Sequence, residues 1–263
     1  MRVYATVAWL GLRKQATYAL ATIAGAFTNT VFGFVRAAVL IALWQARPGL
    51  AGYDVGDAIT FCFLSQAMIA PVRTLSGGIP ELAERIRTGD VAIDLSRPAG
   101  LQAWWFALDL GQAGHGTLFR SLPPLAAGAL VFGLNTPADL ATGVLFAVSI
   151  ALATLTSFGV RYLVALGTFW LMDDRGLVNI STLAAMFCSG MLLPLNIFPG
   201  TLGEVVRLLP WAATVQVPID VYLGTTGGVA GALAFQAFWA VALLLAGRLL
   251  TGVAERRVVV QGG

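Results

Sequence analysis

The sequence has little charge and almost no lysine. Charged residues make up 11% of its 263 positions, whereas an ordinary soluble domain has about 25%. Lys14 is the only lysine, and it lies between Arg13 and Gln15. A nucleotide-binding P-loop requires a Gly-Lys-Ser or Gly-Lys-Thr triplet, so this sequence lacks that motif. Any energy from ATP must therefore come from a partner protein.

Residues that form metal and catalytic sites are also scarce. His115 is the single histidine, and the two cysteines, Cys62 and Cys188, lie in apolar segments where cysteine behaves as a small hydrophobic residue. A zinc site needs several His, Cys or carboxylate ligands together, and no Ser, His and Asp group has a spacing typical of nucleophilic catalysis. We predict no catalytic residue, no metal site, no cofactor on this chain and no disulfide framework.

Apolar residues, in contrast, are abundant: they make up 58% of the chain, against roughly 45 to 50% in soluble domains. Six apolar stretches reach about the 20 residues that a helix needs to cross a bilayer, and they are too continuous for barrel strands of about 10 residues. The third is the least regular, because it contains Arg120 and Pro123-Pro124. We predict an all-α integral membrane protein, a single transmembrane domain over residues 1–263, with six transmembrane helices at about residues 17–45, 57–79, 112–134, 139–171, 177–194 and 228–251.

The first residues lack the features of a cleavable signal peptide. The apolar run from Val3 to Leu12 is short and lies directly before Arg13 and Lys14. A signal peptide has its positive region first and a small-residue cleavage site last. We predict instead that residues 1–14 form an amphipathic interfacial helix that lies on the membrane surface and leads into the first span.

Arginine is distributed unevenly between the two sides of such a bundle. With both termini inside, the outer segments hold only Arg47 and Arg207. Positive charge in short loops near span ends sets orientation, so both termini are predicted to be cytoplasmic. The net charge of +3 then reflects topology, and no nucleic-acid partner is expected. The inner charges are Arg2, Arg13, Lys14, Arg73, Arg85, Arg87, Arg97, Arg175, Arg248, Arg256 and Arg257.

The inner loop after the second span contains a short helical pattern over residues 80–88. Pro80 suits a first helical turn and Gly89 can end the helix, while Glu81 and Arg85 are four residues apart and can pair. Such a stiff rod of mixed charge suits a groove on another protein; an interfacial helix that only closes the loop is the alternative. One apolar face is shared by Ile79, Leu82, Ala83 and Ile86.

Two series of motifs give the sequence a likeness to a known family. After the second span come Gly89-Asp90 and Asp94-Leu95-Ser96-Arg97-Pro98, and before the last span come Phe198-Pro199, Leu209-Pro210-Trp211, Pro218 and Leu223-Gly224. In the order and position of these motifs, over nearly the whole chain, the sequence resembles the membrane subunits of bacterial type-2 ATP-binding-cassette (ABC) exporters, in particular their six-span branch.

This resemblance implies a permease of the bacterial plasma (inner) membrane that pairs with a second permease, identical or homologous, and with two cytoplasmic ATPase subunits. ATP and Mg would bind to those subunits. The charged loop after the fourth span is only Asp173-Asp174-Arg175, so the resemblance does not decide whether this loop forms a second ATPase contact. In such exporters a coupling helix after the second span sits in a cleft of the ATPase, and the residues that match it are Pro80, Glu81, Leu82, Glu84, Arg85, Ile86 and Arg87, with Arg13 and Lys14 flanking the same surface.

Prolines and glycine interrupt the apolar sequence before the last span. Proline lacks a backbone donor and clashes with the preceding turn, so one continuous helix is excluded. We predict that residues 195–224 form a re-entrant outer segment with short helices at 201–209 and 211–223, as the resemblance also implies. The alternative is an ordinary extracellular loop in which Asp220 only stays hydrated. The interruptions are Pro194, Pro199, Gly200 and Pro210.

A few polar residues lie inside the first predicted span, where they are costly and therefore candidates for the transport pathway. Gly25, Asn29 and Gly33 recur every four residues on one face, which suits either close helix packing or pathway lining, and Thr30 allows the same two interpretations. Arg36 either belongs to the pathway or reaches the outer interface by snorkelling. The pathway candidates are thus Asn29, Gly33, Arg36 and Thr30.

A surface helix is predicted before the third span, over about residues 101–119. Trp104 and Trp105 suit the depth of the lipid headgroups. Asp109, His115 and Arg120 are assigned to this surface helix where it meets the span.

Two classes of function fit these features. A permease driven by a separate ATPase accounts for the inner rod, the missing P-loop and the broken outer segment. An ion- or proton-coupled secondary transporter should instead place carboxylates near the bilayer midplane and show an inverted repeat, and the sequence shows neither. The mostly apolar spans suit amphipathic or hydrophobic cargo, as in multidrug or natural-product efflux, and the direction of export rests on the resemblance.

Overall fold

The computed structural model describes residues 2–171 and 173–257, and the regular structure within them is entirely helical. The all-α prediction is therefore confirmed for this part of the chain. Met1 of the predicted interfacial helix and residues 258–263 of the predicted domain lie outside the described residues. The α-helices are α1 (Arg2–Ala16), α2 (Ala19–Ala46), α3 (Val55–Val72), α4 (Pro80–Thr88), α5 (Val91–Leu95), α6 (Leu101–Gly116), α7 (Leu122–Phe132), α8 (Leu140–Leu166), α9 (Thr168–Leu171), α10 (Arg175–Cys188), α11 (Gly200–Leu208), α12 (Gln216–Leu223) and α13 (Val229–Ala254).

Four helical segments of the described chain are long and apolar enough to cross a membrane. They are α2, α3, the pair α8 and α9 over Leu140–Leu171, and α13, and they overlap the first, second, fourth and sixth predicted spans. α10 is apolar but shorter. It ends at Cys188 instead of the predicted residue 194, because Gly190 takes a left-handed backbone conformation (φ 87°) that interrupts the helix.

The third predicted span, 112–134, is part of a longer helical segment made of α6 and α7. A π-helical turn, η3 (Thr117–Ser121), joins the two helices, and Pro123 and Pro124 follow it in the first turn of α7. A π-bulge interrupts the regular hydrogen bonding of a helix without ending it. The hydroxyl of Ser121 donates to the carbonyl of Ala67, so the turn is also attached to α3.

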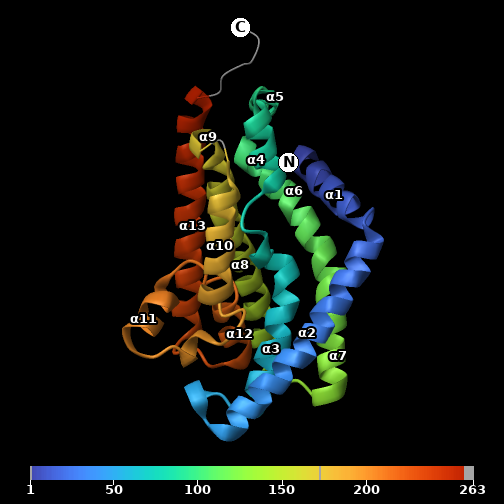
Figure 1. The fold of residues 1–263 in the computed structure, drawn as a ribbon, viewed down its shortest axis with the longest axis vertical. Helices are drawn as coiled ribbons and strands as arrows, with labels where there is room; N and C mark the ends of the chain where they lie inside the picture. Colours follow the sequence, from blue (N-terminus) through green and yellow to red (C-terminus); the bar gives the residue numbers. More distant parts are fainter. Residues whose placement is uncertain (1, 172, 258–263) are drawn as a thin grey trace.

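The long helices run between two ends of the molecule (Figure 1). α2 leads from α1 to the lower end of this view, α3 returns, α6 and α7 descend, α8 returns, α10 descends, and α13 runs back to the upper end. α4, α5 and α9 lie at that upper end, whereas α11, α12 and the connection between α2 and α3 lie toward the lower end. The first helix and the end of α13 therefore share one side of the molecule with α4.

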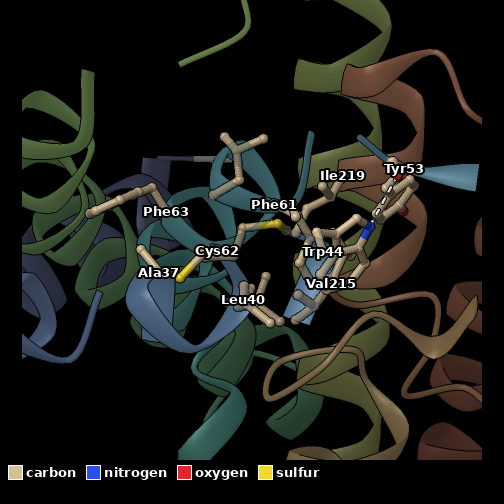
Figure 2. Close-up of a cluster of buried hydrophobic side chains, with 14 residues drawn as sticks. Ala37, Leu40, Trp44, Tyr53, Phe61, Cys62, Phe63, Val215 and Ile219 are labelled. Atoms are coloured by element: carbon tan, nitrogen blue, oxygen red, sulfur yellow. Dashed lines mark hydrogen bonds between the residues drawn. The ribbon is translucent and has the colours of Figure 1, made fainter. Parts of the chain in front are cut away.

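A cluster of buried side chains packs α2, α3 and α12 together (Figure 2). Trp44 of α2 stacks on Tyr53 with 6.4 Å between ring centroids, and its Nε1 donates to the carbonyls of Leu50 and Tyr53. Phe61 of α3 and Ile219 of α12 are buried in the same cluster. Close packing of this kind holds helices together in lipid, where no hydrophobic force drives helix association.

A second cluster attaches α4 to the long helices. Leu82 and Ile86 of α4 are buried together with Trp105 of α6 and with Phe158 and Tyr162 of α8. The apolar face of α4 is thus covered by its own chain, while its charged side chains remain at the surface. Leu82 and Ile86 therefore anchor the helix to its own chain.

Large apolar side chains cover the outside of the bundle. On α2, Leu20 is 84% exposed, and Phe27 is exposed on the same helix. Phe238 and Leu249 project in the same way from α13. Extensive exposed apolar surface marks contact with lipid or with another protein. The long helices therefore turn apolar side chains outward, as a membrane environment requires.

Candidate coupling site and polar interior

α4 forms where the sequence supplies signals for both of its ends. Pro80 occupies the first turn, where its missing N–H is not needed. Gly89 (φ 84°) ends the helix in the left-handed conformation that favours glycine. Glu81 lies near the positive end of the helix dipole, and Arg85 and Arg87 lie near the negative end. These local effects produce a short, well-defined helix.

The predicted pairing of Glu81 with Arg85 within α4 is wrong. Arg85 donates from Nε and Nη2 to the two carboxylate oxygens of Asp94, at 2.5 and 3.0 Å. Glu81 instead accepts from Lys14 of α1 at 2.6 Å. The planar guanidinium fits both oxygens of one carboxylate. Because Asp94 is only 3% exposed, this pair is also screened less by solvent and salt than a pair on the open helix surface.

Asp94 connects α4 to the segment that follows it. Its carboxylate also accepts from Arg97 at 2.9 Å, and the guanidinium of Arg97 lies 4.6 Å from the centre of the Trp104 ring in α6. The motif Asp94-Leu95-Ser96-Arg97-Pro98 therefore fastens α4 to α6. Sequence reasoning gave Asp94 no role, although a carboxylate nine residues after Arg85 and three before Arg97 is a usable signal.

α1 lies against α6, which brings its last turn to α4. Gly111 of α6 permits this close approach, because a β-carbon there would overlap the carbonyl oxygen of Ala8 in α1. Lys14 then reaches Glu81, with each side chain about half exposed, and Arg13 is exposed in the same turn. α1 ends at Ala16, two residues beyond the predicted limit.

An open groove of about 580 Å³ lies between α1, α4 and α6. Lys14, Glu81, Glu84 and Trp104 line it, and Glu84 also pairs with Arg87 on the exposed face of α4. Both signs of charge thus lie next to an indole ring. Aromatic side chains and complementary charge are typical of surfaces that bind other proteins.

A buried ionic cluster lies beneath α4. Asp109 of α6 accepts from Nη1 and Nη2 of Arg161 in α8 at 2.8 and 2.6 Å, and from Nη1 of Arg73 at 2.7 Å. Asp109 and Arg161 are each only 3% exposed. Asp109 does lie on the predicted helix before the third span, but its side chain is buried against other helices. α6 packs against α1 and α8, and the carboxylate is neutralised by arginines that lie 36 and 52 residues away in sequence.

Arg73 lies at the joint between α3 and α4. Its backbone is left-handed (φ 52°), which is uncommon for a residue other than glycine, and its Nη1 also donates to the side-chain oxygen of Gln112 in α6. One residue earlier, the carbonyl of Val72 accepts from the hydroxyl of Ser157 in α8 at 2.5 Å. α3, α6 and α8 are therefore tied together directly below α4.

Arg36 is hydrogen-bonded to other parts of the protein. Its Nη1 donates to the hydroxyl of Ser65 in α3 at 3.0 Å, and its Nη2 donates to the carbonyl of Leu192, after α10, at 2.9 Å. Arg36 thus joins α2, α3 and the chain that leads into the outer segment.

The other three pathway candidates also lie on α2. Asn29 is buried, and its Nδ2 has no hydrogen-bond partner within the described residues. Gly33 faces α3, where a β-carbon would lie 2.9 Å from the ring of Phe63. Thr30 donates to the carbonyl of Ala26 in its own helix at 2.8 Å. The four candidates therefore do not form one cluster of mutual contacts.

A hydrogen-bonded group around Tyr53 ties the outer segment to the bundle. The Tyr53 hydroxyl donates to Asp220 of α12 and accepts from Nε2 of Gln216 at 3.1 Å. The side-chain oxygen of Gln216 in turn accepts from the backbone N–H of Leu195 at 2.8 Å. Burial raises the pKa of the Asp220 carboxyl, against the lowering effect of these donors. Asp220 is thus built into the structure and is not simply hydrated.

Of the two short outer helices, α11 lies close to its predicted range, and α12 begins later than predicted. α11 begins at Gly200, one residue before the predicted start, whereas α12 begins at Gln216 and not at residue 211. Residues 210–215 form turns, in which the hydroxyl of Thr214 donates to the carbonyl of Trp211 at 2.6 Å. Such a side-chain bond to the backbone competes with helix formation.

The scarce histidine and cysteines are separated in space. His115 is buried with its ring 4.7 Å from that of Phe119, and Cys62 and Cys188 are both free. Within residues 2–171 and 173–257, no three His, Cys, Asp or Glu side chains come together as a group that could hold a metal ion.

A known protein family matches most of the chain, from within α2 to beyond α13. A family model described as "ABC-2 family transporter protein" matches residues 30–262. A search of curated proteins gives no match. The matched range includes the motifs around Asp94 and in the outer segment, and the apolar helices described above. The chain therefore belongs to the ABC-2 transporter family, and it is a transmembrane permease component of an ABC transporter.

Proposed function

We propose that this permease is an exporter subunit that works with a second permease, identical or homologous, and with two cytoplasmic ABC ATPase subunits. Family membership implies ATPase partners; their number, the second permease and the direction of transport are the proposal. ATP and Mg would bind to the ATPase subunits. α4 would be the coupling helix, with Pro80, Glu81, Glu84, Arg85 and Arg87, together with Arg13 and Lys14, at the contact and with Leu82 and Ile86 as its anchors.

The division of α4 into two faces is the observation that carries this proposal. Its apolar face is buried against α6 and α8, so the helix is attached firmly to its own chain. Glu84 and Arg87 are exposed on the other side, beside the groove lined by Lys14 and Trp104. A free charged face on a firmly attached helix is suited to receive force from a partner.

The contacts below α4 provide a route for that force into the bundle. Asp94 links α4 to the segment before α6 through Arg85 and Arg97. The cluster of Asp109, Arg73 and Arg161 then links α6 to α3 and α8. A displacement of α4 by an ATPase would therefore move several long helices together, because packed interiors transmit strain.

The proposed topology has six crossings of a bacterial inner membrane, made by α2, α3, the α6–α7 segment, the α8–α9 segment, α10 and α13. Both ends of the chain would be cytoplasmic, with α1 at the interface. Two findings support this orientation: α1 and the end of α13 share one side with α4 (Figure 1), and that side carries most of the arginines, which favour the cytoplasm.

The outer segment, residues 195–224, would cover the pathway on the far side. Tyr53, Gln216 and Asp220 attach it to the end of the bundle opposite α4. Arg36 bonds to the chain that enters it, and Asn29 lies two turns earlier on α2 with an unused amide donor. We place these two residues, with Thr30 and Gly33, along the pathway that the second permease would complete.

An ion- or proton-coupled secondary transporter is the second candidate, and two findings count against it. The chain belongs to an ABC transporter family. Asp109, a buried carboxylate of the kind such a mechanism needs, is held between Arg73 and Arg161, whereas a coupling carboxylate must be able to exchange its proton or ion.

Co-purification tests the proposed coupling. The permease is co-expressed with its ABC ATPase, and the amount of ATPase retained and its rate of ATP hydrolysis are measured for Glu84→Arg and Arg87→Glu. Both reversals place like charges at a complementary contact and should sharply reduce ATPase retention. Arg207→Glu, on exposed α11 at the outer end, is the matched control and should behave as wild type. Full ATPase retention and full transport in both reversal variants would refute the coupling role of α4.

A further inference from the structure

A polar cavity of about 210 Å³ lies where the end of α1 meets α3, α6 and the π-helical turn η3. Liquid water occupies about 30 Å³ per molecule, so this cavity has room for a polar group larger than one water. Its polar wall is formed by Gln15, Arg73, Ser76, Gln112 and Arg120.

Arg120 is the member of this wall whose charge is not balanced. Within the described residues it makes no hydrogen bond or ion pair, and its Nε is buried without a partner. The guanidinium lies against Gly25 of α2, where a β-carbon would be 2.6 Å from Nη2. Arginine stays protonated in proteins. A partly buried cation without a partner is unfavourable, so the site calls for an anion.

The neighbouring charges add to this excess. Arg73 lines the same cavity, and it shares the single carboxylate of Asp109 with Arg161. Arg73, Arg120 and Arg161 thus contribute three positive charges against one negative charge, and the wall of the cavity contains no carboxylate. The net charge of this region is about two positive units, and the single negative charge of a lipid phosphodiester would reduce this excess.

We propose that this cavity binds the phosphate of an anionic lipid headgroup from the inner leaflet. The guanidinium groups of Arg73 and Arg120 match phosphate oxygens in geometry, while Gln15 and Ser76 supply further donors. A basic pocket between transmembrane helices on the cytoplasmic side is suited to such a headgroup. The inference uses the proposed membrane orientation but not the coupling role of α4.

A lipid is favoured over free phosphate by the apolar surface beside the cavity. Leu118 and Phe119 are exposed in the same π-helical turn as Arg120. Tyr18 and Leu20 are exposed at the start of α2, close in sequence to Gln15. Acyl chains can lie along these side chains while the phosphate occupies the polar cavity. The bound lipid would then connect α1, α3 and η3 below the joint that supports α4.

Native mass spectrometry of the full-length protein in detergent tests this site. The protein is titrated with phosphatidylglycerol and, separately, with phosphatidylcholine, whose headgroup has no net charge. Wild type should bind phosphatidylglycerol more tightly. Arg120→Gln should weaken that binding by about tenfold or more, because charge-assisted bonds to phosphate are lost. Arg175→Gln removes an 83% exposed cation outside the cavity wall and should leave the binding unchanged.

A second cavity variant and a competition with inorganic phosphate complete the test. Gln15→Glu places a carboxylate in the cavity wall and should also weaken binding of phosphatidylglycerol, which covers the case in which Arg120→Gln fails to fold. Inorganic phosphate in large excess should not displace the lipid from wild type; displacement would assign the cavity to free phosphate and overturn the lipid proposal. Equal binding of phosphatidylglycerol by wild type and by the folded cavity variants would overturn the site itself.

Discussion

Replacing Asp109 with asparagine tests whether the buried ionic cluster holds α6 to α3 and α8. The change keeps the side-chain shape but removes the carboxylate that Arg73 and Arg161 share, and Arg161 is almost fully buried. Removing one partner of a buried ion pair costs about 3–5 kcal/mol. At about 2–4 °C per kcal/mol for a chain of this size, the midpoint of thermal unfolding should fall by about 6–20 °C.

Fluorescence-detected size exclusion after heating, performed on the detergent-solubilised permease, measures this midpoint. Glu84→Gln is the matched control, because it removes one carboxylate from an exposed pair and should cost less than about 1 kcal/mol. The double variant Asp109→Asn, Arg161→Gln should recover part of the loss, since it removes one unpaired charge. A midpoint for Asp109→Asn within about 2 °C of wild type, equivalent to less than about 1 kcal/mol, would refute the reasoning.

Three other substitutions test separate contacts. Gly111→Leu should abolish the packing of α1 on α6 and lower the yield of folded protein, because even a β-carbon at this position overlaps the backbone of α1. Gly114→Ala is the control: its β-carbon meets nothing within 4 Å, so the variant should match wild type in the same size-exclusion assay. Tyr53→Phe should cost about 1–3 kcal/mol by leaving buried partners of its hydroxyl unsatisfied, and a thermal midpoint no lower than that of the exposed Tyr18→Phe would contradict this. Asp94→Asn should loosen α4 and reduce ATPase retention on co-purification, and wild-type retention would show that the link is dispensable.

Helix ends, buried helix faces and long apolar helices can be predicted from the sequence, because each depends on residues that are close together in the chain. Pro80 and Gly89 mark the two ends of α4, and apolar residues three and four apart define the face that is buried. The long apolar runs likewise identify α2, α3, α8 and α13, because length and composition alone determine whether a helix can cross a bilayer.

Contacts between distant parts of the chain were not accessible in the same way. Spacing within α4 favoured a pair between Glu81 and Arg85, but tertiary structure offered Arg85 the buried carboxylate of Asp94. The buried pairing of Asp109 was not predicted, because its partners, Arg73 and Arg161, lie far away in the sequence. A single sequence contains no direct record of such pairings.

Helix interruptions were predicted in part. Proline in α7 indicated an irregular third span, but the π-helical turn that accommodates it also depends on the bond from Ser121 to α3. α10 stops at Cys188 because of the backbone conformation of Gly190, and glycine alone does not reveal whether its φ will be positive.

Cysteine cross-linking at α4 tests the central claim most directly. In a chain whose Cys62 and Cys188 are replaced by alanine, Arg87→Cys is treated in membranes with a short thiol-to-amine reagent while the ABC ATPase is present. Attachment of α4 to the ATPase predicts a cross-linked permease–ATPase product from Arg87→Cys and none from Arg207→Cys at the opposite end. Labelling of Arg87→Cys by a probe confined to the lipid phase, without any ATPase product, would contradict the account.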